Sequence, residues 1–270
     1  MCAEGVRKLR SGKLVAAFAV LLVVSFAVMN AMPSDTLLAA LLQEAVLALV
    51  ALVAVGLAVP DALKRCTQTV QQRSIVRFTA ITLLLVGLVG GAITLLAWLF
   101  AGGGNMAGFA STALPSTADL MENLLLLLGI CLLTGLYEES FMRVLGIEAF
   151  ERALDTKRAI LASAALFALL HVGAPDVSAG QLVLLQTALK FGQALLFGVI
   201  LGALYVRTRR LWRCALIHAG FDVLYMAPNV LLTGTMPETY ASGAVGDTVL
   251  LAVSVLMLSG IVLKIRKEIA

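Results

Sequence analysis

The sequence has very little charge for its length. Only 13% of its 270 residues are Asp, Glu, Lys or Arg, whereas 61% are hydrophobic, and the mean hydropathy is +1.00. Soluble globular domains are about one quarter charged, so this chain has too little polar surface to enclose one soluble core. The composition excludes an ordinary soluble domain and predicts that much of the apolar surface faces lipid.

Paired cysteines and a concentrated basic region are also lacking. The four cysteines have no CxxC or other paired spacing, so we interpret them as free thiols without a disulfide or metal role (Cys2, Cys66, Cys131 and Cys214). The net charge of +4 arises from short basic clusters between apolar runs, which does not indicate nucleic-acid binding. The chain has no solenoid repeat and no linker, so residues 1–270 are predicted to form a single membrane domain.

Eight apolar runs are long enough, or nearly so, to cross a bilayer as helices. They cover residues 14–32, 37–59, 78–100, 121–142, 159–172, 182–206, 211–232 and 244–263. The first run exceeds the h-region of a signal peptide and no small-x-small cleavage site follows it, so we expect an uncleaved helix. Strand-like alternation is lacking, and the prediction is an all-α polytopic membrane protein of about eight transmembrane helices in one bundle.

The basic residues predict how these helices are oriented. Lys and Arg outside the runs occur before the first run and after the second, fourth, sixth and eighth. If eight helices cross the membrane in alternating directions, all these segments lie on one side of it, and the loops on the opposite side contain no Lys or Arg. By the positive-inside rule both termini are cytoplasmic, and the compact, loop-poor chain suits a bacterial cell membrane.

Ionisable side chains inside spans cost about 2.5–3.5 kcal/mol each, so each needs a reason. Near the end of the fourth run, Glu139 and Arg143 are spaced i,i+4 with the acid first, the favourable order for a helical ion pair. Glu138 then lies on another face without an intrahelical partner, and such a carboxylate can serve as a general base. The alternative is that all three residues form a solvated helix end.

The only two histidines also lie in apolar runs. His171 ends the fifth run, whereas His218 and Asp222 are four residues apart in the seventh. An Asp at this spacing can orient the imidazole, or the two can face one ligand. Counted at 1.5 Å per residue, His218 lies about 8 Å from Arg213, but His171 lies about 20 Å from Arg158. The histidines can meet only if the fifth helix starts well outside the bilayer or tilts strongly.

Taken together, these residues form a hydrolytic constellation. Glu138 could take a proton from water, and the histidines could bind a metal or stabilise an oxyanion. The HExxH pattern of zinc peptidases is absent, so spacing alone predicts no metal. Zinc stays an open alternative, with His171 and His218 as its ligands.

Three motifs in order resemble the CPBP family of intramembrane proteases, the CAAX prenyl endopeptidases and bacteriocin-processing proteins once grouped as "Abi". They are Glu138-Glu139-x-x-x-Arg143, Phe167-x-x-x-His171 and His218-x-x-x-Asp222. The resemblance covers roughly residues 120–230, the expected protease-like core.

The resemblance implies roles for the individual residues. Glu138 would activate the attacking water with His171 as its partner, and His218 would bind or polarise the substrate carbonyl. Glu139 and Arg143 would support them from the same helix.

Position 222 departs from the family, which often has Asn there as an oxyanion donor. An ionised Asp222 cannot donate a hydrogen bond, so it would have to act protonated, orient His218 or ligate a metal.

The sequence therefore predicts an intramembrane endopeptidase that hydrolyses a membrane-associated or CAAX-type peptide by glutamate-activated water. Its partners would be membrane lipid and a peptide or protein substrate. Two alternatives stay open: a proton-coupled transporter, although matching inverted halves are lacking, and a non-catalytic membrane immunity or interaction protein.

Two further charges stand alone in apolar surroundings, Glu44 and Lys190. We interpret Lys190 as a snorkelling lysine and Glu44 as neutral or facing a polar groove. The alternative is a role in a substrate pathway or in an ion pair, with each other or with other groups.

Overall fold

The regular elements of the structure are all helical. The structure is a computed structural model that describes residues 2–32, 34–64, 70–100, 115–172, 180–237 and 240–269. Its helices are α1 (Cys2–Ala31), α2 (Leu37–Ala58), α3 (Asp61–Lys64), α4 (Val70–Phe100), α5 (Thr117–Glu139), η1 (Ser140–Ile147), α6 (Glu148–Phe150), α7 (Thr156–Val172), α8 (Gln181–Thr208), α9 (Leu211–Thr233) and α10 (Val245–Ile269).

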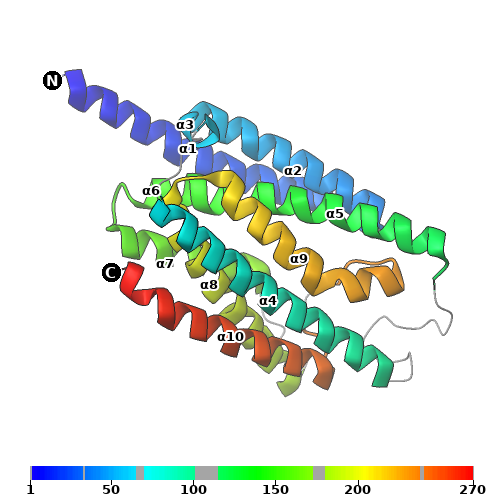
Figure 1. The fold of residues 1–270 in the computed structure, drawn as a ribbon. Helices are drawn as coiled ribbons and strands as arrows, with labels where there is room; N and C mark the ends of the chain where they lie inside the picture. Colours follow the sequence, from blue (N-terminus) through cyan, green and yellow to red (C-terminus); the bar gives the residue numbers. More distant parts are fainter. Residues whose placement is uncertain are drawn as a thin grey trace.

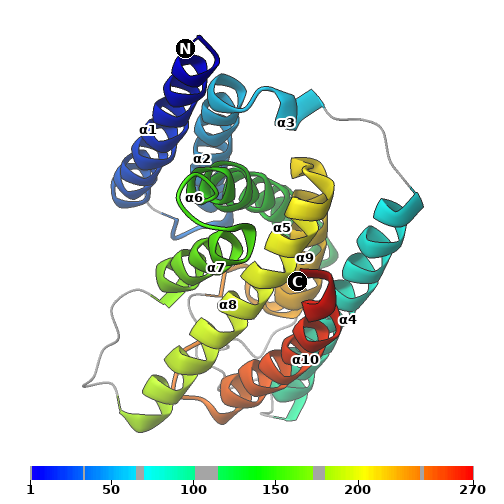
Figure 2. The ribbon, with the colours of Figure 1, turned by 90° about the vertical axis from the view of Figure 1, so that its left-hand side faces the viewer.

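The long helices run side by side in one bundle (Figure 1). Helix α9 lies between α5 and α4, and α8 packs against α7 and α10. Helix α2 packs on the other side of α5, and α1 packs against α2 and η1. The two ends of the described chain lie at the same end of the bundle (Figures 1 and 2).

Seven helices of the described chain are long and apolar enough to cross a membrane, which confirms a polytopic all-α membrane protein. The exception among the eight predicted runs is α7, whose 17 residues extend only about 25 Å, less than the hydrocarbon core of about 30 Å. The fourth span is longer than predicted: instead of 121–142 it covers Thr117–Phe150, because η1 and α6 continue α5.

Large apolar side chains remain exposed on the outside of the bundle. Leu57, Leu256 and Val245 are 78%, 72% and 70% exposed, and they lie on two spanning helices, α2 and α10. Apolar side chains exposed to this extent are unfavourable in water, and they are expected where lipid covers the surface. Cys131 and Cys214 are buried free thiols, whereas Cys66 lies outside the described residues.

The sequence contains the signals that start two of these helices. Thr36 caps α2 by accepting a hydrogen bond from the Ala39 amide at 3.2 Å. Ser116 and Asp119 form a reciprocal capping box at the start of α5. These caps satisfy backbone donors that a helix end leaves free, and the second defines where the helix carrying the glutamate pair begins.

Candidate active site

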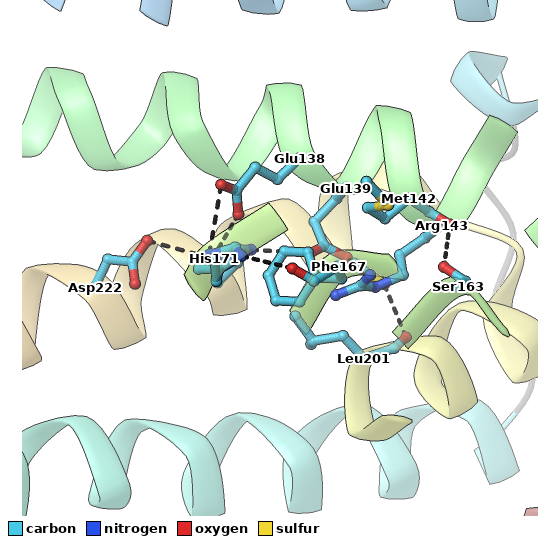
Figure 3. Close-up of polar contacts among 11 residues, drawn as sticks. Glu138, Glu139, Met142, Arg143, Ser163, Phe167, His171, Leu201 and Asp222 are labelled. Carbon is cyan, nitrogen blue, oxygen red and sulfur yellow. Dashed lines mark hydrogen bonds and ion pairs between the residues drawn. The ribbon is translucent and has the colours of Figure 1, made fainter. Parts of the chain in front are cut away.

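The six predicted site residues converge in the middle of the bundle. Helix α5 supplies the two glutamates, η1 the arginine, α7 one histidine, and α9 the other histidine with the aspartate (Glu138, Glu139, Arg143, His171, His218 and Asp222). Figure 3 shows Glu138 and Glu139 pointing from their helix towards the residues of α7 and α9. The site therefore combines four elements that are up to 84 residues apart in sequence.

One half of the site is sealed from the surroundings. Glu139 and Arg143 have side chains with 0% exposure, and Arg143 Nε lies 3.1 Å from Glu139 Oε2. The other oxygen of Glu139 lies 2.8 Å from Nδ1 of His218, which is 4% exposed. The predicted ion pair is confirmed, and its carboxylate also accepts a hydrogen bond from Nδ1 of His218, which directs Nε2 to the opposite side.

The other half of the site is accessible. The side chains of Glu138, His171 and Asp222 are 19%, 27% and 15% exposed. Glu138 Oε1 lies 3.8 Å from Nε2 of His171, and Oε2 lies 3.5 Å from Nε2 of His218. Glu138 thus faces two histidines of other helices, consistent with the prediction that it has no partner on its own helix.

Asp222 faces the same ring nitrogen as Glu138. Its Oδ2 lies 3.3 Å from Nε2 of His218, which fits the interaction predicted from their i,i+4 spacing. Two carboxylates therefore meet at one imidazole nitrogen. This arrangement favours a proton shared among these three groups, because two ionised carboxylates at this separation repel each other.

Aromatic rings and a backbone carbonyl fix the histidines. Nδ1 of His171 lies 2.9 Å from the carbonyl oxygen of Phe167. Because a carbonyl oxygen only accepts hydrogen bonds, Nδ1 carries the proton of the neutral ring, and Nε2 faces Glu138 with a lone pair. The Phe167 ring lies 4.1 Å from the His171 ring, and Phe197 lies 4.8 Å from His218. Arg143 stacks over Phe167 at 4.6 Å.

A close helix crossing positions the glutamate pair. A Cβ atom on Gly135 of α5 would lie 2.6 Å from the carbonyl oxygen of Ala215 on α9. Only glycine lets the two backbones approach this closely. One turn farther along, the same approach places Glu139 within hydrogen-bonding distance of His218.

A π-helical segment follows the glutamate pair directly. The segment η1 (Ser140–Ile147) changes the hydrogen-bonding register of the helix immediately after Glu139, and π-helical turns are frequent at functional sites. Ser163 of α7 donates a hydrogen bond of 2.6 Å to the carbonyl oxygen of Met142 within it. Arg143 thus projects from a segment that α7 holds in place.

The histidines meet although they lie at different distances from the basic residues that precede them. Both approach Glu138, so α7 reaches the site about 12 Å farther along its axis from Arg158 than α9 does from Arg213. That the fifth predicted helix starts well outside the bilayer or tilts strongly stays a prediction.

The described side chains do not form a ready metal site. No group of three or more His, Cys, Asp or Glu side chains among them is arranged to hold a metal ion, and tetrahedral zinc needs three or four such ligands. Zinc at His171 and His218 therefore stays a prediction, and no chemical step is derived through it.

Comparison with known proteins agrees with the motifs. Residues 120–224 match the family model described as type II CAAX prenyl endopeptidase, Rce1-like. This stretch is similar to Rce1-like endopeptidases. It contains all six site residues, and the resemblance predicted from the sequence is confirmed. No curated protein sequence matches the chain.

Two contributions to the Rce1-like core could not be predicted from motifs. The close approach at Gly135 has no signal beyond a small residue in an apolar helix. Arg209, interpreted as one of several basic loop residues, donates hydrogen bonds to Glu148 at 2.9 Å and to Glu151 at 2.8 Å. These contacts join the corner between α8 and α9 to the end of the π-helical segment.

Proposed function

We propose that the chain is an intramembrane endopeptidase in which Glu138 activates water for attack on a peptide carbonyl of a membrane-associated substrate. The observation that carries the proposal is that each oxygen of Glu138 faces Nε2 of a different histidine, at 3.8 Å for His171 and 3.5 Å for His218. Two atoms at these separations can both lie about 2.8 Å from one water oxygen. A water between Glu138 and a histidine therefore fits this geometry.

The different exposure of the two glutamate side chains supports different roles for them. The Glu138 side chain is 19% exposed, whereas the Glu139 side chain is fully buried. Glu139 would hold His218 through Nδ1 and be held in turn by Arg143. It is thus a positioning residue, and Glu138 is the general base.

The reaction would proceed in two steps. Glu138 takes a proton from water as the water oxygen bonds to the carbonyl carbon, and negative charge develops on the carbonyl oxygen. A protonated Nε2 of His218 would donate to that oxygen, with the Glu139 carboxylate stabilising the imidazolium. Glu138 then returns its proton to the leaving amine as the C–N bond breaks, which leaves one new amine and one new carboxylic acid, and the acid loses its proton to solvent.

Asp222 would keep His218 charged in this scheme. Its carboxylate stands 3.3 Å from Nε2, which favours the imidazolium over the neutral ring. Where the family often has an oxyanion-donating Asn, this chain would stabilise the oxyanion with the histidine that the aspartate keeps protonated.

The side of the membrane is part of the proposal. The two ends of the chain share one end of the bundle, and the basic loops are expected on that side. We infer that this side is cytoplasmic and that the substrate is a membrane-associated, CAAX-type peptide.

Hydrolysis of membrane peptides by the purified chain in detergent tests this proposal. Glu138→Gln should lower kcat by about 10²–10⁴-fold, the contribution of a general base. Glu122→Gln, an exposed carboxylate on the same helix, should match wild type. Equal, measurable rates for Glu138→Gln and wild type would overturn the catalytic role of Glu138, whereas no cleavage by either would favour the non-catalytic interaction protein. A parallel series with chelator decides whether zinc is required.

A further inference from the structure

The ammonium group of Lys190 lies inside the bundle, and no carboxylate of the described residues lies within 4.0 Å of it. Lys190 is half-buried in α8, and its Nζ donates a hydrogen bond of 3.2 Å to Gln193 Oε1. Because this bond directs the ammonium towards the middle of the helix, the interpretation of a snorkelling lysine is wrong. Within the described part of the chain no carboxylate, Glu44 included, forms an ion pair with it. A cation at this depth needs a compensating role.

Three polar aromatic and amide groups hold this ammonium in place. Gln193 Nε2 donates to the Tyr225 hydroxyl at 2.9 Å, which fixes the amide so that its oxygen faces Lys190. The Lys190 Nζ lies 5.4 Å from the centre of the Tyr240 ring, which packs edge-on against Tyr225 at 5.3 Å. The Tyr240 hydroxyl is buried and has no hydrogen-bond partner among the described residues. The ammonium thus lies over the Tyr240 ring, and the ammonium and the Tyr240 hydroxyl both retain hydrogen-bonding capacity.

This pair of donors lies beside the proposed catalytic cluster. Lys190 interacts electrostatically with Asp222, Glu138 and His171. Along α8, Gln193 precedes Phe197 by one turn, about 6 Å, and Phe197 packs on the His218 ring. An extended peptide advances about 3.3 Å per residue. By this spacing the ammonium would lie about two to three substrate residues from the bond to be cleaved.

We propose that Lys190, with the Tyr240 hydroxyl as a second donor, binds a carboxylate of the substrate and so determines where the chain is cleaved. The proposal rests on the endopeptidase function above. A carboxylate is the ligand for this site because it accepts from both donors and neutralises the buried cation. It is either the free α-carboxylate at the end of the substrate or the side chain of Asp or Glu at that distance.

Matched peptides test the inference with the full chain in detergent. One membrane-associated peptide ends in a free carboxylate two or three residues after the cleaved bond, the second is its C-terminal amide, and the third is the amide with Glu at that position. Wild type should cleave a carboxylate peptide about 10- to 100-fold better in kcat/KM than the plain amide, the range of one charge-assisted hydrogen bond. A preference for the first peptide identifies the α-carboxylate as the group that is bound, and a preference for the third identifies an acidic side chain.

Substitution of the lysine should remove this preference. Lys190→Met should cleave the carboxylate peptide no better than the amide, mainly through a higher KM, and Tyr240→Phe should lose part of the preference. Lys264→Met, which removes another lysine stacked on an aromatic ring, should keep it. Equal losses on all three peptides would overturn the inference, since Lys190 would then only balance the charge of the cluster.

The two proposals fail in different ways. A wild-type chain that cleaves all three peptides equally well contradicts carboxylate recognition and leaves the endopeptidase intact. A wild-type chain that cleaves none, with Glu138→Gln indistinguishable from it, contradicts both.

Discussion

Adding a single methyl group at Gly135 should disable the site without touching a polar residue. The new Cβ would lie 2.6 Å from the Ala215 carbonyl oxygen, whereas ordinary contacts begin near 3.4 Å. To relieve the clash α5 and α9 must separate by about 0.8 Å, which would stretch the 2.8 Å contact between Glu139 and His218 beyond the usual hydrogen-bond range of about 3.2 Å. Misplacement of about 1 Å can cost about 10²-fold in rate.

The assay is peptide hydrolysis by Gly135→Ala in detergent, with thermal unfolding measured on the same sample. We expect kcat to fall about 10²-fold while the helical content is kept. Gly260→Ala is the matched control, because a Cβ there meets nothing within 4 Å and alanine favours a helix. Full activity of Gly135→Ala would refute the reasoning that the α5–α9 approach sets the geometry of the site.

Three further predictions concern stability and topology. Glu139→Gln should lower the free energy of unfolding by about 3–5 kcal/mol, since it leaves the fully buried Arg143 charge unpaired. In thermal unfolding, the double variant with Arg143→Met should recover part of this loss. No recovery would contradict the pairing. Ser163→Ala should cost about 1 kcal/mol through the lost bond to the Met142 carbonyl, with activity kept; an unchanged unfolding midpoint would argue against that bond. A reporter that is active only in the cytoplasm should be active when it is fused to either end of the chain. Activity of a reporter that works only outside the cytoplasm, at either end, would contradict the predicted orientation.

The sequence was most informative where polar residues interrupt apolar helices. Charges are costly in a membrane, so Glu138, His171 and Asp222 stood out without any structure. Fixed helical spacing then predicted the contacts between Glu139 and Arg143 and between His218 and Asp222. Contacts between helices, such as those of Glu138, followed only from the resemblance.

Other features depend on geometry that spacing does not encode. The π-helical register after Glu139 leaves no compositional mark, so the fourth span was predicted to end at residue 142 rather than at Phe150. The inward hydrogen bond of Lys190 arises because Gln193 is itself held by Tyr225 of another helix. Since both depend on tertiary packing, a single sequence favoured the simpler interpretations.

The origin of the oxygen in the product tests the central claim most directly. Single-turnover hydrolysis by wild type in ¹⁸O-labelled water, followed by mass spectrometry of the product, distinguishes attack by water from attack by the Glu138 carboxylate. If Glu138 activates water, the new carboxylate of the first turnover carries one labelled oxygen. An unlabelled product carboxylate, with its oxygen taken from the protein, would contradict the proposal that Glu138 acts as a general base.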